Sequence, residues 1–209
     1  MCCWRRLRVW AGSEPVGRSL RALAWRWQVP VMTLLLSACA GLGPPESAVP
    51  AWEPLPPHTL GRTLAAQQRV QARLGGHRRV FDAAVEVNRQ GLQVVLLTPL
   101  GQRVASLRYN GRVLRFEKGA AAPDSFPPAM MLEAMQMIYW PAAVLNGRAG
   151  AGGWRIEEQR RRRVVFYAER AVAELRYSTD EPWQGRVEMV NYPHGYSLTV
   201  DSAILSPGQ

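Results

Sequence analysis

Few of the side chains that usually carry catalysis or metal binding occur in this chain, and they are widely spaced. The 209 residues include three histidines, His58, His77 and His194, and no two of them have the His-x-x-x-His spacing of a zinc-binding helix. Ser197 and Asp201 lie close to His194 in the sequence, but a Ser–His–Asp triad is defined by its arrangement in space. The sequence therefore predicts no catalytic residue, no metal site and no cofactor, and it favours a protein that is not an enzyme.

Two short runs of residues could bind anions. Residues 150–153, Gly-Ala-Gly-Gly, lack the Gly-Lys-Ser/Thr ending of a phosphate loop, so a flexible turn is expected there. Residues 160–163 are four consecutive arginines, for which we expect the solvated end of a hairpin. The alternative is contact with the phosphates of anionic lipid or lipopolysaccharide, because the planar guanidinium group of arginine binds phosphate well.

Cys39 is the residue at which covalent chemistry is predicted. It ends the run Leu-Ser-Ala-Cys at residues 36–39, which follows an apolar stretch and an arginine-rich segment. A basic region, a short apolar region and small residues together form the pattern of a secretory signal. The run resembles the lipobox of bacterial lipoproteins, in which the cysteine thiol receives a diacylglycerol and the chain is then cut before the cysteine.

This resemblance implies that residues 1–38 are a signal peptide and that Cys39 anchors the mature chain to a membrane. Several acyl chains hold a protein far more firmly than a single myristoyl chain does. Ala40 stands where an inner-membrane retention signal would have Asp, so the implied location is the outer membrane, facing the periplasm. The alternative is a cysteine buried in the core of a cytosolic protein.

The net charge of +10 is unevenly distributed. Residues 1–38 hold six arginines and one glutamate, which is +5, half of the total. Much of the basicity therefore belongs to targeting, and no nucleic-acid partner is expected. No run of about 18 apolar residues occurs, so no transmembrane helix is predicted.

The mature chain is expected to begin with a flexible tether. Residues 39–59 contain the lipidated cysteine and a stretch rich in Gly, Pro, Ala and Glu, which offers little apolar surface to bury. Residues 60–209 then form a single folded domain.

Short segments of alternating polarity separated by turn signals predict that this domain is mainly β. The clearest hairpin covers residues 104–117, where Asn110-Gly111 is a strong two-residue turn signal. A two-residue loop would place Leu107 opposite Leu114 and would gather the apolar side chains on one face. We therefore expect an antiparallel sheet that covers a core on one side.

One segment, residues 127–140, is predicted to be a helix. Pro128 suits its first turn and Pro141 ends it, and between them the residues are apolar nearly all round. Such a helix must be largely covered. The expected fold is α+β and mainly β: a curved antiparallel sheet of nine or ten strands, or incomplete barrel, wrapped around one central apolar helix.

The methionine-rich helix is the best candidate for a binding function. Methionine adapts to irregular ligands, and barrel-like folds often line their ligand cavities with apolar side chains. Plain core packing is the alternative reading. The candidate cavity-lining residues are Met130, Met131, Met135, Ile138 and Trp140.

Several motifs in order resemble a known family. They are Leu-Thr-Pro-Leu-Gly-Gln-Arg at residues 97–103, Tyr-Asn-Gly at 109–111, Gln-Met-Ile-Tyr-Trp-Pro at 136–141, then Tyr177, Pro182-Trp183, Gly185, Asn191 and Gly195-Tyr196. Over residues 60–205 the chain looks like uncharacterised bacterial lipoproteins that are often encoded in aryl-polyene gene clusters.

The resemblance implies a fold similar to the LolA/LolB lipoprotein carriers and receptors, an incomplete barrel with an apolar cavity. It implies no catalytic residues. The expected function is an envelope lipoprotein that binds or transfers a lipid-like cargo, such as an aryl-polyene lipid or a lipoprotein. The alternative is a scaffold with a filled core and no ligand.

Overall fold

A single antiparallel sheet of ten strands forms the framework of the computed structural model. The strand order is β5-β4-β3-β2-β1-β10-β9-β8-β7-β6, so two meanders meet where β1 pairs with β10. Among the described residues β5 and β6 lie at opposite ends of this order and do not pair, which leaves the sheet open. The strands are β1 (Leu64–Leu74), β2 (His77–Val87), β3 (Leu92–Leu97), β4 (Arg103–Tyr109), β5 (Leu114–Lys118), β6 (Trp154–Gln159), β7 (Arg162–Tyr167), β8 (Arg170–Tyr177), β9 (Gly185–Asn191) and β10 (Tyr196–Leu205).

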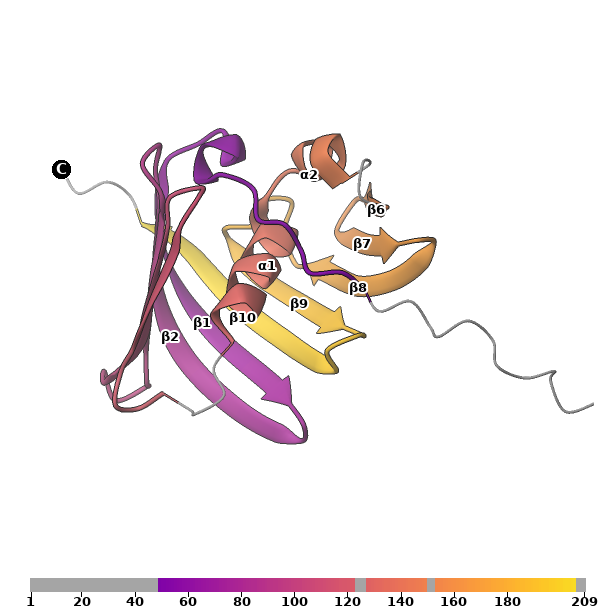
Figure 1. Ribbon diagram of the computed structural model, residues 1–209. Helices are drawn as coiled ribbons and strands as arrows, with labels where there is room; N and C mark the ends of the chain where they lie inside the picture. Colours follow the sequence, from indigo (N-terminus) through magenta and orange to yellow (C-terminus); the bar gives the residue numbers. More distant parts are fainter. Residues whose placement is uncertain (1–48, 123–126, 150–152, 206–209) are drawn as a thin grey trace, which may run out of the picture. The chain divides into compact units, whose positions relative to one another are not determined.

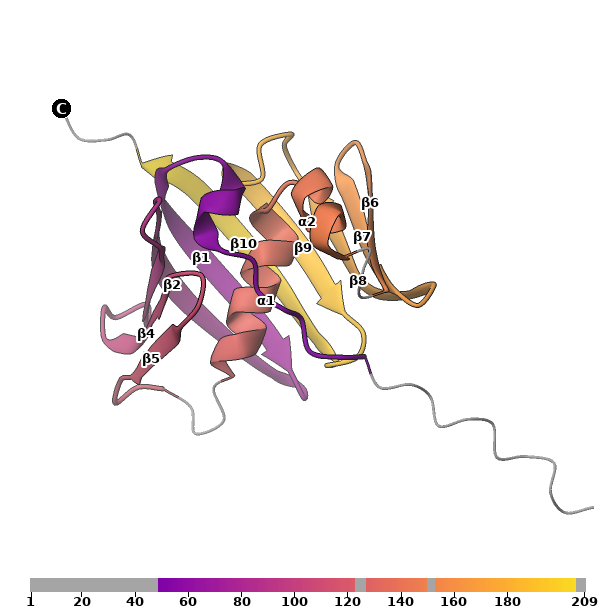
Figure 2. The same cartoon turned by 45° about the horizontal axis from the view of Figure 1, so that its top comes forward.

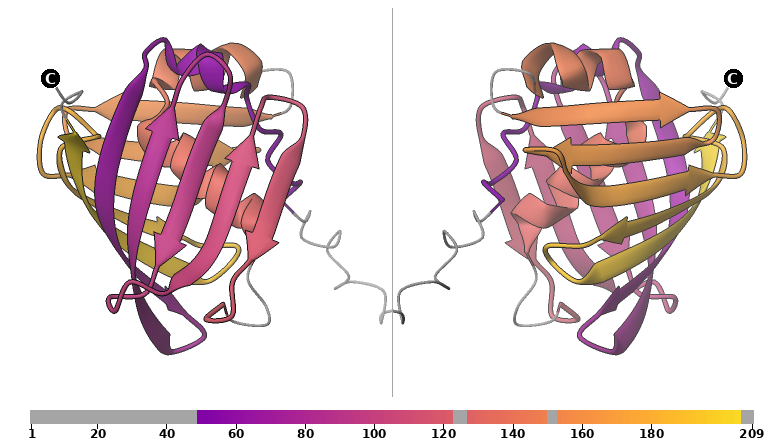
Figure 3. Two further views of the ribbon diagram at one scale, coloured as in Figure 1. Left: turned by 90° about the vertical axis from the view of Figure 1, so that its left-hand side faces the viewer. Right: turned by 90° about the vertical axis from the view of Figure 1, so that its right-hand side faces the viewer.

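The structure describes residues 49–122, 127–149 and 153–205. The predicted signal peptide and Cys39 lie outside these residues, as does most of the glycine-rich run. Within them the prediction of a mainly β fold with a curved, unclosed antiparallel sheet is confirmed (Figures 1 and 3).

Alternation of side chains along the strands gives the curved sheet one buried face. In β3 every second residue is buried, beginning with Leu92, and β9 alternates in the same way up to Asn191. Side chains of successive strand residues point to opposite faces, so the apolar set gathers on one side. That side is the concave face of the sheet.

The helices lie on the concave side and at one end. They are the short helix η1 (Pro57–Leu60), α1 (Pro128–Tyr139) and α2 (Ala142–Ala149). Helix α1 crosses the concave face (Figures 1 and 2). It has proline in its first turn and ends before Pro141, as predicted. Helix α2 was not predicted, because a short Ala-rich segment with an internal glycine carries a weak helical signal. Its Asn146 exchanges hydrogen bonds of 2.8 Å with the backbone of Ile156 in β6.

The predicted register of the β4–β5 hairpin is wrong by two residues. Leu107 lies opposite Phe116, not Leu114, because the loop contains four residues. The Asn110 side-chain Oδ1 accepts hydrogen bonds from the backbone N–H of Arg112 (3.0 Å) and Val113 (2.8 Å), which closes the wider turn. A shift of two leaves each side chain on its predicted face.

Part of the predicted tether is packed against α1. Leu55 is only 2% exposed. Its N–H donates to Gln136 Oε1 at 2.9 Å, and Gln136 Nε2 donates back to its carbonyl at 2.7 Å. Trp52 Nε1 also donates to Gln136 Oε1, at 3.1 Å. The prediction of a flexible tether over residues 39–59 is therefore wrong for its last part. The buried Gln136 amide needs hydrogen-bond partners, and this segment supplies them.

The arginine run is divided between surface and core. Arg160, Arg161 and Arg162 are exposed at the β6–β7 turn, as predicted. Arg163 is 2% exposed, so the expectation of solvent is wrong for this residue. Its Nη1 donates to the carbonyl of Met137 at 2.5 Å and to that of Trp140 at 2.9 Å. Arg163 thus satisfies carbonyls at the C-terminus of α1, which have no partner within the helix.

Candidate functional site

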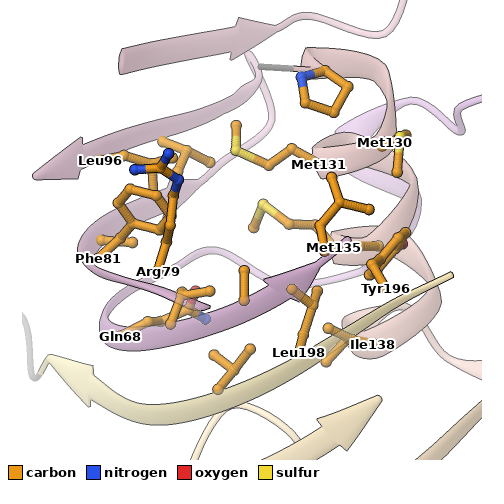
Figure 4. A pocket seen from close by; sticks show the side chains of 18 of the residues that line it. Gln68, Arg79, Phe81, Leu96, Met130, Met131, Met135, Ile138, Tyr196 and Leu198 are labelled. Atoms are coloured by element: carbon orange, nitrogen blue, oxygen red, sulfur yellow. The ribbon is translucent and has the colours of Figure 1, made fainter. Parts of the chain in front are cut away.

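A cavity of about 290 Å³ lies between α1 and the concave face of the sheet (Figure 4). One wall is Pro127 and the part of α1 from Met130 to Tyr139, and the other consists of residues of β1, β2, β3 and β10. The lining is predominantly apolar. Its volume is close to the lower end of the range for small-molecule pockets, about 300–1,000 Å³.

Four of the five candidate cavity-lining residues line this cavity: Met130, Met131, Met135 and Ile138. Met131, Met135 and Ile138 are spaced by four and three positions, so they share one helix face. Trp140 does not line the cavity: this residue is 0% exposed and its Nε1 donates to Thr59 Oγ1 at 2.9 Å. Trp140 follows the last helical residue in an extended conformation, which turns it away from the helix face.

The opposite wall was not found from the sequence. It includes Val70 of β1, Phe81 of β2, Leu96 of β3 and Leu198 of β10. Figure 4 shows the last three of these facing the methionines. Period-two alternation could identify the buried face of each strand, but not which strands face α1.

A neutral polar cluster lies at the inner part of the cavity. Gln68 Nε2 donates to Tyr139 Oη at 2.8 Å and contacts Ser202 Oγ at 3.2 Å, and Tyr139 Oη lies 2.8 Å from Ser202 Oγ. Burial raises the pKa of Tyr139 above its ordinary value, so the phenol stays protonated. Tyr139 also stacks on Trp183 with a centroid distance of 3.9 Å. These bonds fix the cluster and leave no charge in this part of the cavity.

A second tyrosine lies beside α1. Tyr196 lines the cavity and is buried, and its hydroxyl has no hydrogen-bond partner within the described structure. Burial raises its pKa and the neighbouring Glu133 raises it further, while the Asn191 side chain acts to lower it. The pKa of Glu133 is itself raised, by burial, while His194 and Asn191 act to lower it.

The mouth of the cavity, where its lining residues are exposed, comprises Arg73, Leu74, His77, Arg79 and Pro127. The first four belong to the end of the β1–β2 hairpin, next to Gly75 and Gly76. The cavity therefore runs from a basic, solvent-exposed end to an apolar and then neutral polar interior.

Apolar side chains are exposed on turns at this end of the sheet. Leu100, in the β3–β4 turn, is 88% exposed. Leu74 and Tyr192 are about half exposed, and Leu74 pairs with Tyr196, which follows the β9–β10 turn that holds Tyr192. Figure 3 shows the β1–β2 and β3–β4 turns at the same edge. Exposed apolar groups gathered at one end are typical of a contact surface.

The residues first considered for catalysis form no site of that kind. The Asp201 carboxylate accepts hydrogen bonds from Arg186, at 2.7 and 3.0 Å. Across residues 49–122, 127–149 and 153–205, no group of three His, Cys, Asp or Glu side chains is placed to hold a metal ion. No helix in the same ranges is long and apolar enough to cross a membrane.

In a comparison with known protein families, residues 65–203 match one family model, described as "Protein of unknown function (DUF3261)". No curated protein matches the chain. The chain is similar to the crystal structure of a LolA superfamily protein from Nitrosomonas europaea, with 11% identity, coverage of 70% of this chain and 87% of that one, and a TM-score of 0.41. A DUF1329 family protein from Desulfovibrio piger gives 10% identity, the same coverages of 70% and 87%, and a TM-score of 0.37. At these low identities and TM-scores the two structures carry no argument about function, so the function must be argued from the cavity itself.

Proposed function

This chain belongs to the DUF3261 family, and from that premise we propose that it is a non-enzymatic envelope protein that binds a lipid-like ligand in the cavity beside α1. The observation that carries the proposal is the cavity: about 290 Å³ of space with a largely apolar lining and an open mouth. Protein cores are packed with few voids larger than a water molecule. A cavity of this size next to a buried helix therefore suggests a ligand.

The side chains of the cavity favour a pliable ligand over a rigid one. Met131 and Met135 extend from α1 toward the sheet, and Met130 also lines the cavity. Methionine side chains are unbranched and fill irregular gaps, so this wall can adapt to a chain of variable shape. The volume suits one chain or ring system, and three acyl chains together would need more room.

The proposal also covers the cargo of the protein and its location in the cell. The resemblance to lipoproteins of aryl-polyene gene clusters makes an aryl-polyene lipid the named candidate cargo, and a lipoprotein acyl chain is the other. Cys39 would carry the lipid anchor that holds the chain at the outer membrane, facing the periplasm. The exposed Leu100 and Leu74 at the mouth end would contact the bilayer during transfer of an apolar ligand.

Native mass spectrometry of the purified chain tests ligand binding directly. We expect a co-purified molecule of lipid-like mass, and binding of an apolar fluorescent probe after its removal. Met135→Trp should fill the cavity and reduce probe binding while the protein stays folded. If no lipid co-purifies and the wild type does not bind the probe, the chain is a scaffold with no ligand.

Met135 and Met137 form a matched pair for the same question. Both are buried in α1, but Met135 lines the cavity whereas Met137 does not. Met137→Ala should cost about 2–5 kcal/mol, as is usual for a packed methionine. Met135→Ala should cost less, because part of its surface already faces open space. Equal losses in chemical denaturation would show that the Met135 site is filled.

A further inference from the structure

The end of the β1–β2 hairpin concentrates positive charge. Arg73, His77, Arg78 and Arg79 flank the Gly75-Gly76 turn, and Arg73 lies directly opposite Arg78 across the two strands. Like charges directly opposite each other destabilise a sheet. Four positions back on the same face of β1, Arg69 shows the usual solution, since it lies opposite Asp82 and binds it at 2.9 Å.

Among the described residues, Arg73 and Arg79 at the mouth have no carboxylate partner. Ion pairs satisfy other arginines of the sheet, among them Arg162 with Glu174 and Arg186 with Asp201. Within the described ranges neither Arg73 nor Arg79 forms an ion pair, and the cavity lining contains no Asp or Glu. The mouth therefore holds positive charge that nothing in this part of the protein neutralises.

Strand geometry directs one of these cations into the cavity. Arg79, Phe81 and Ala83 occupy alternate positions of β2 and so share its inner face, whereas Arg78 is on the outer face. Figure 4 shows Arg79 beside Phe81 and Leu96, at one end of the row of apolar side chains.

The distance from this cation to the polar cluster sets a length for the ligand. Arg79 is opposite Ala72 of β1, four residues from Gln68. At about 3.3 Å per residue this is roughly 13 Å. The space between is apolar, and a medium-length alkyl chain spans it.

We propose that the ligand is a single-chain amphiphile with an anionic headgroup, whose tail lies along α1 and whose oxygens are bound by Arg79. The inference rests on the proposed function, because it concerns the same cavity. A guanidinium presents a planar fork of donors that matches the paired oxygens of a phosphate or carboxylate.

The test compares dodecyl phosphate with dodecanol, which has the same tail and no charge. Calorimetric titrations use the full chain carrying Cys39→Ser, so that no lipid anchor competes with the probe. The wild type should bind dodecyl phosphate about tenfold more tightly than dodecanol at low salt, and Arg79→Gln should remove this preference. Arg78→Gln, which removes the same charge from the outer face, should preserve it. Inorganic phosphate alone should not displace the amphiphile.

Each contrary result overturns a different statement. Equal binding of dodecyl phosphate and dodecanol would overturn the headgroup inference and leave the lipid-binding function in place. Equal effects of Arg78→Gln and Arg79→Gln, together with weaker binding of both variants to anionic vesicles, would assign the charge to a membrane surface. Displacement by inorganic phosphate would indicate a free-phosphate site. If neither amphiphile binds, the proposed function fails as well.

Discussion

Arg163 shows how a single side chain holds the end of α1 in place. Its guanidinium reaches the carbonyls of Met137 and Trp140, and its Nη2 pairs with Glu158 at 2.6 Å. Buried carbonyls that lose their donors cost about 1–3 kcal/mol each. Arg163→Met should therefore lower the free energy of unfolding by about 3 kcal/mol, measured by chemical denaturation. Arg160→Met, in the exposed part of the same run, should change it by less than about 0.5 kcal/mol. Similar midpoints for the two variants would contradict the capping role.

Glu133 should make stability depend on pH. Burial raises its pKa above the ordinary value of 4.5, with His194 and Asn191 opposing the shift. The folded state then binds the proton more tightly than the unfolded state, so the contribution of Glu133 to stability is fully present below pH 4.5 and is lost as pH rises through the raised pKa. Glu133→Gln should raise the unfolding midpoint at neutral pH, and the difference from wild type should vanish on acidification. Glu53→Gln, at an exposed position, serves as the control. A difference that does not vary with pH would refute this account.

Among the elements, the β4–β5 hairpin depends on Gly111. Its φ is +93°, and a Cβ there would lie 3.0 Å from Pro56 Cβ. Gly111→Val should therefore cost on the order of 1–3 kcal/mol from backbone strain alone, with a further loss from the contact with Pro56. Arg112→Val places the same side chain at the next, exposed position of the loop and should be tolerated. An unchanged thermal midpoint for Gly111→Val would exclude this turn geometry.

For the whole molecule, the proposed function depends on where Cys39 places the domain. Cys39→Ser removes the thiol that would accept lipid, so the variant should lose labelling by a palmitate analogue in cells and should not sediment with the outer membrane. Cys2→Ser and Cys3→Ser lie within the predicted signal peptide and should leave labelling of the mature chain unchanged. Equal labelling of wild type and Cys39→Ser would rule out the lipoprotein.

Local patterns in the sequence were enough to predict the type and position of several elements. Proline at both ends marked α1, and helical spacing placed Met131, Met135 and Ile138 on one face. Asn110 and Gly111 marked a turn. Such signals act within a few residues of the backbone, so they can be read without knowledge of the fold.

The cavity and its charged mouth depended on contacts between distant parts of the chain. Arg163 follows three similar arginines, and only the passage of β7 beside the end of α1 buries it. Gln136 draws in the segment around Leu55, which composition alone describes as flexible. The wall opposite α1 forms because β1 pairs with β10, which brings Val70 opposite Val200. These outcomes depend on the combined packing and hydrogen bonding of many distant groups, and no local sequence window contains that information.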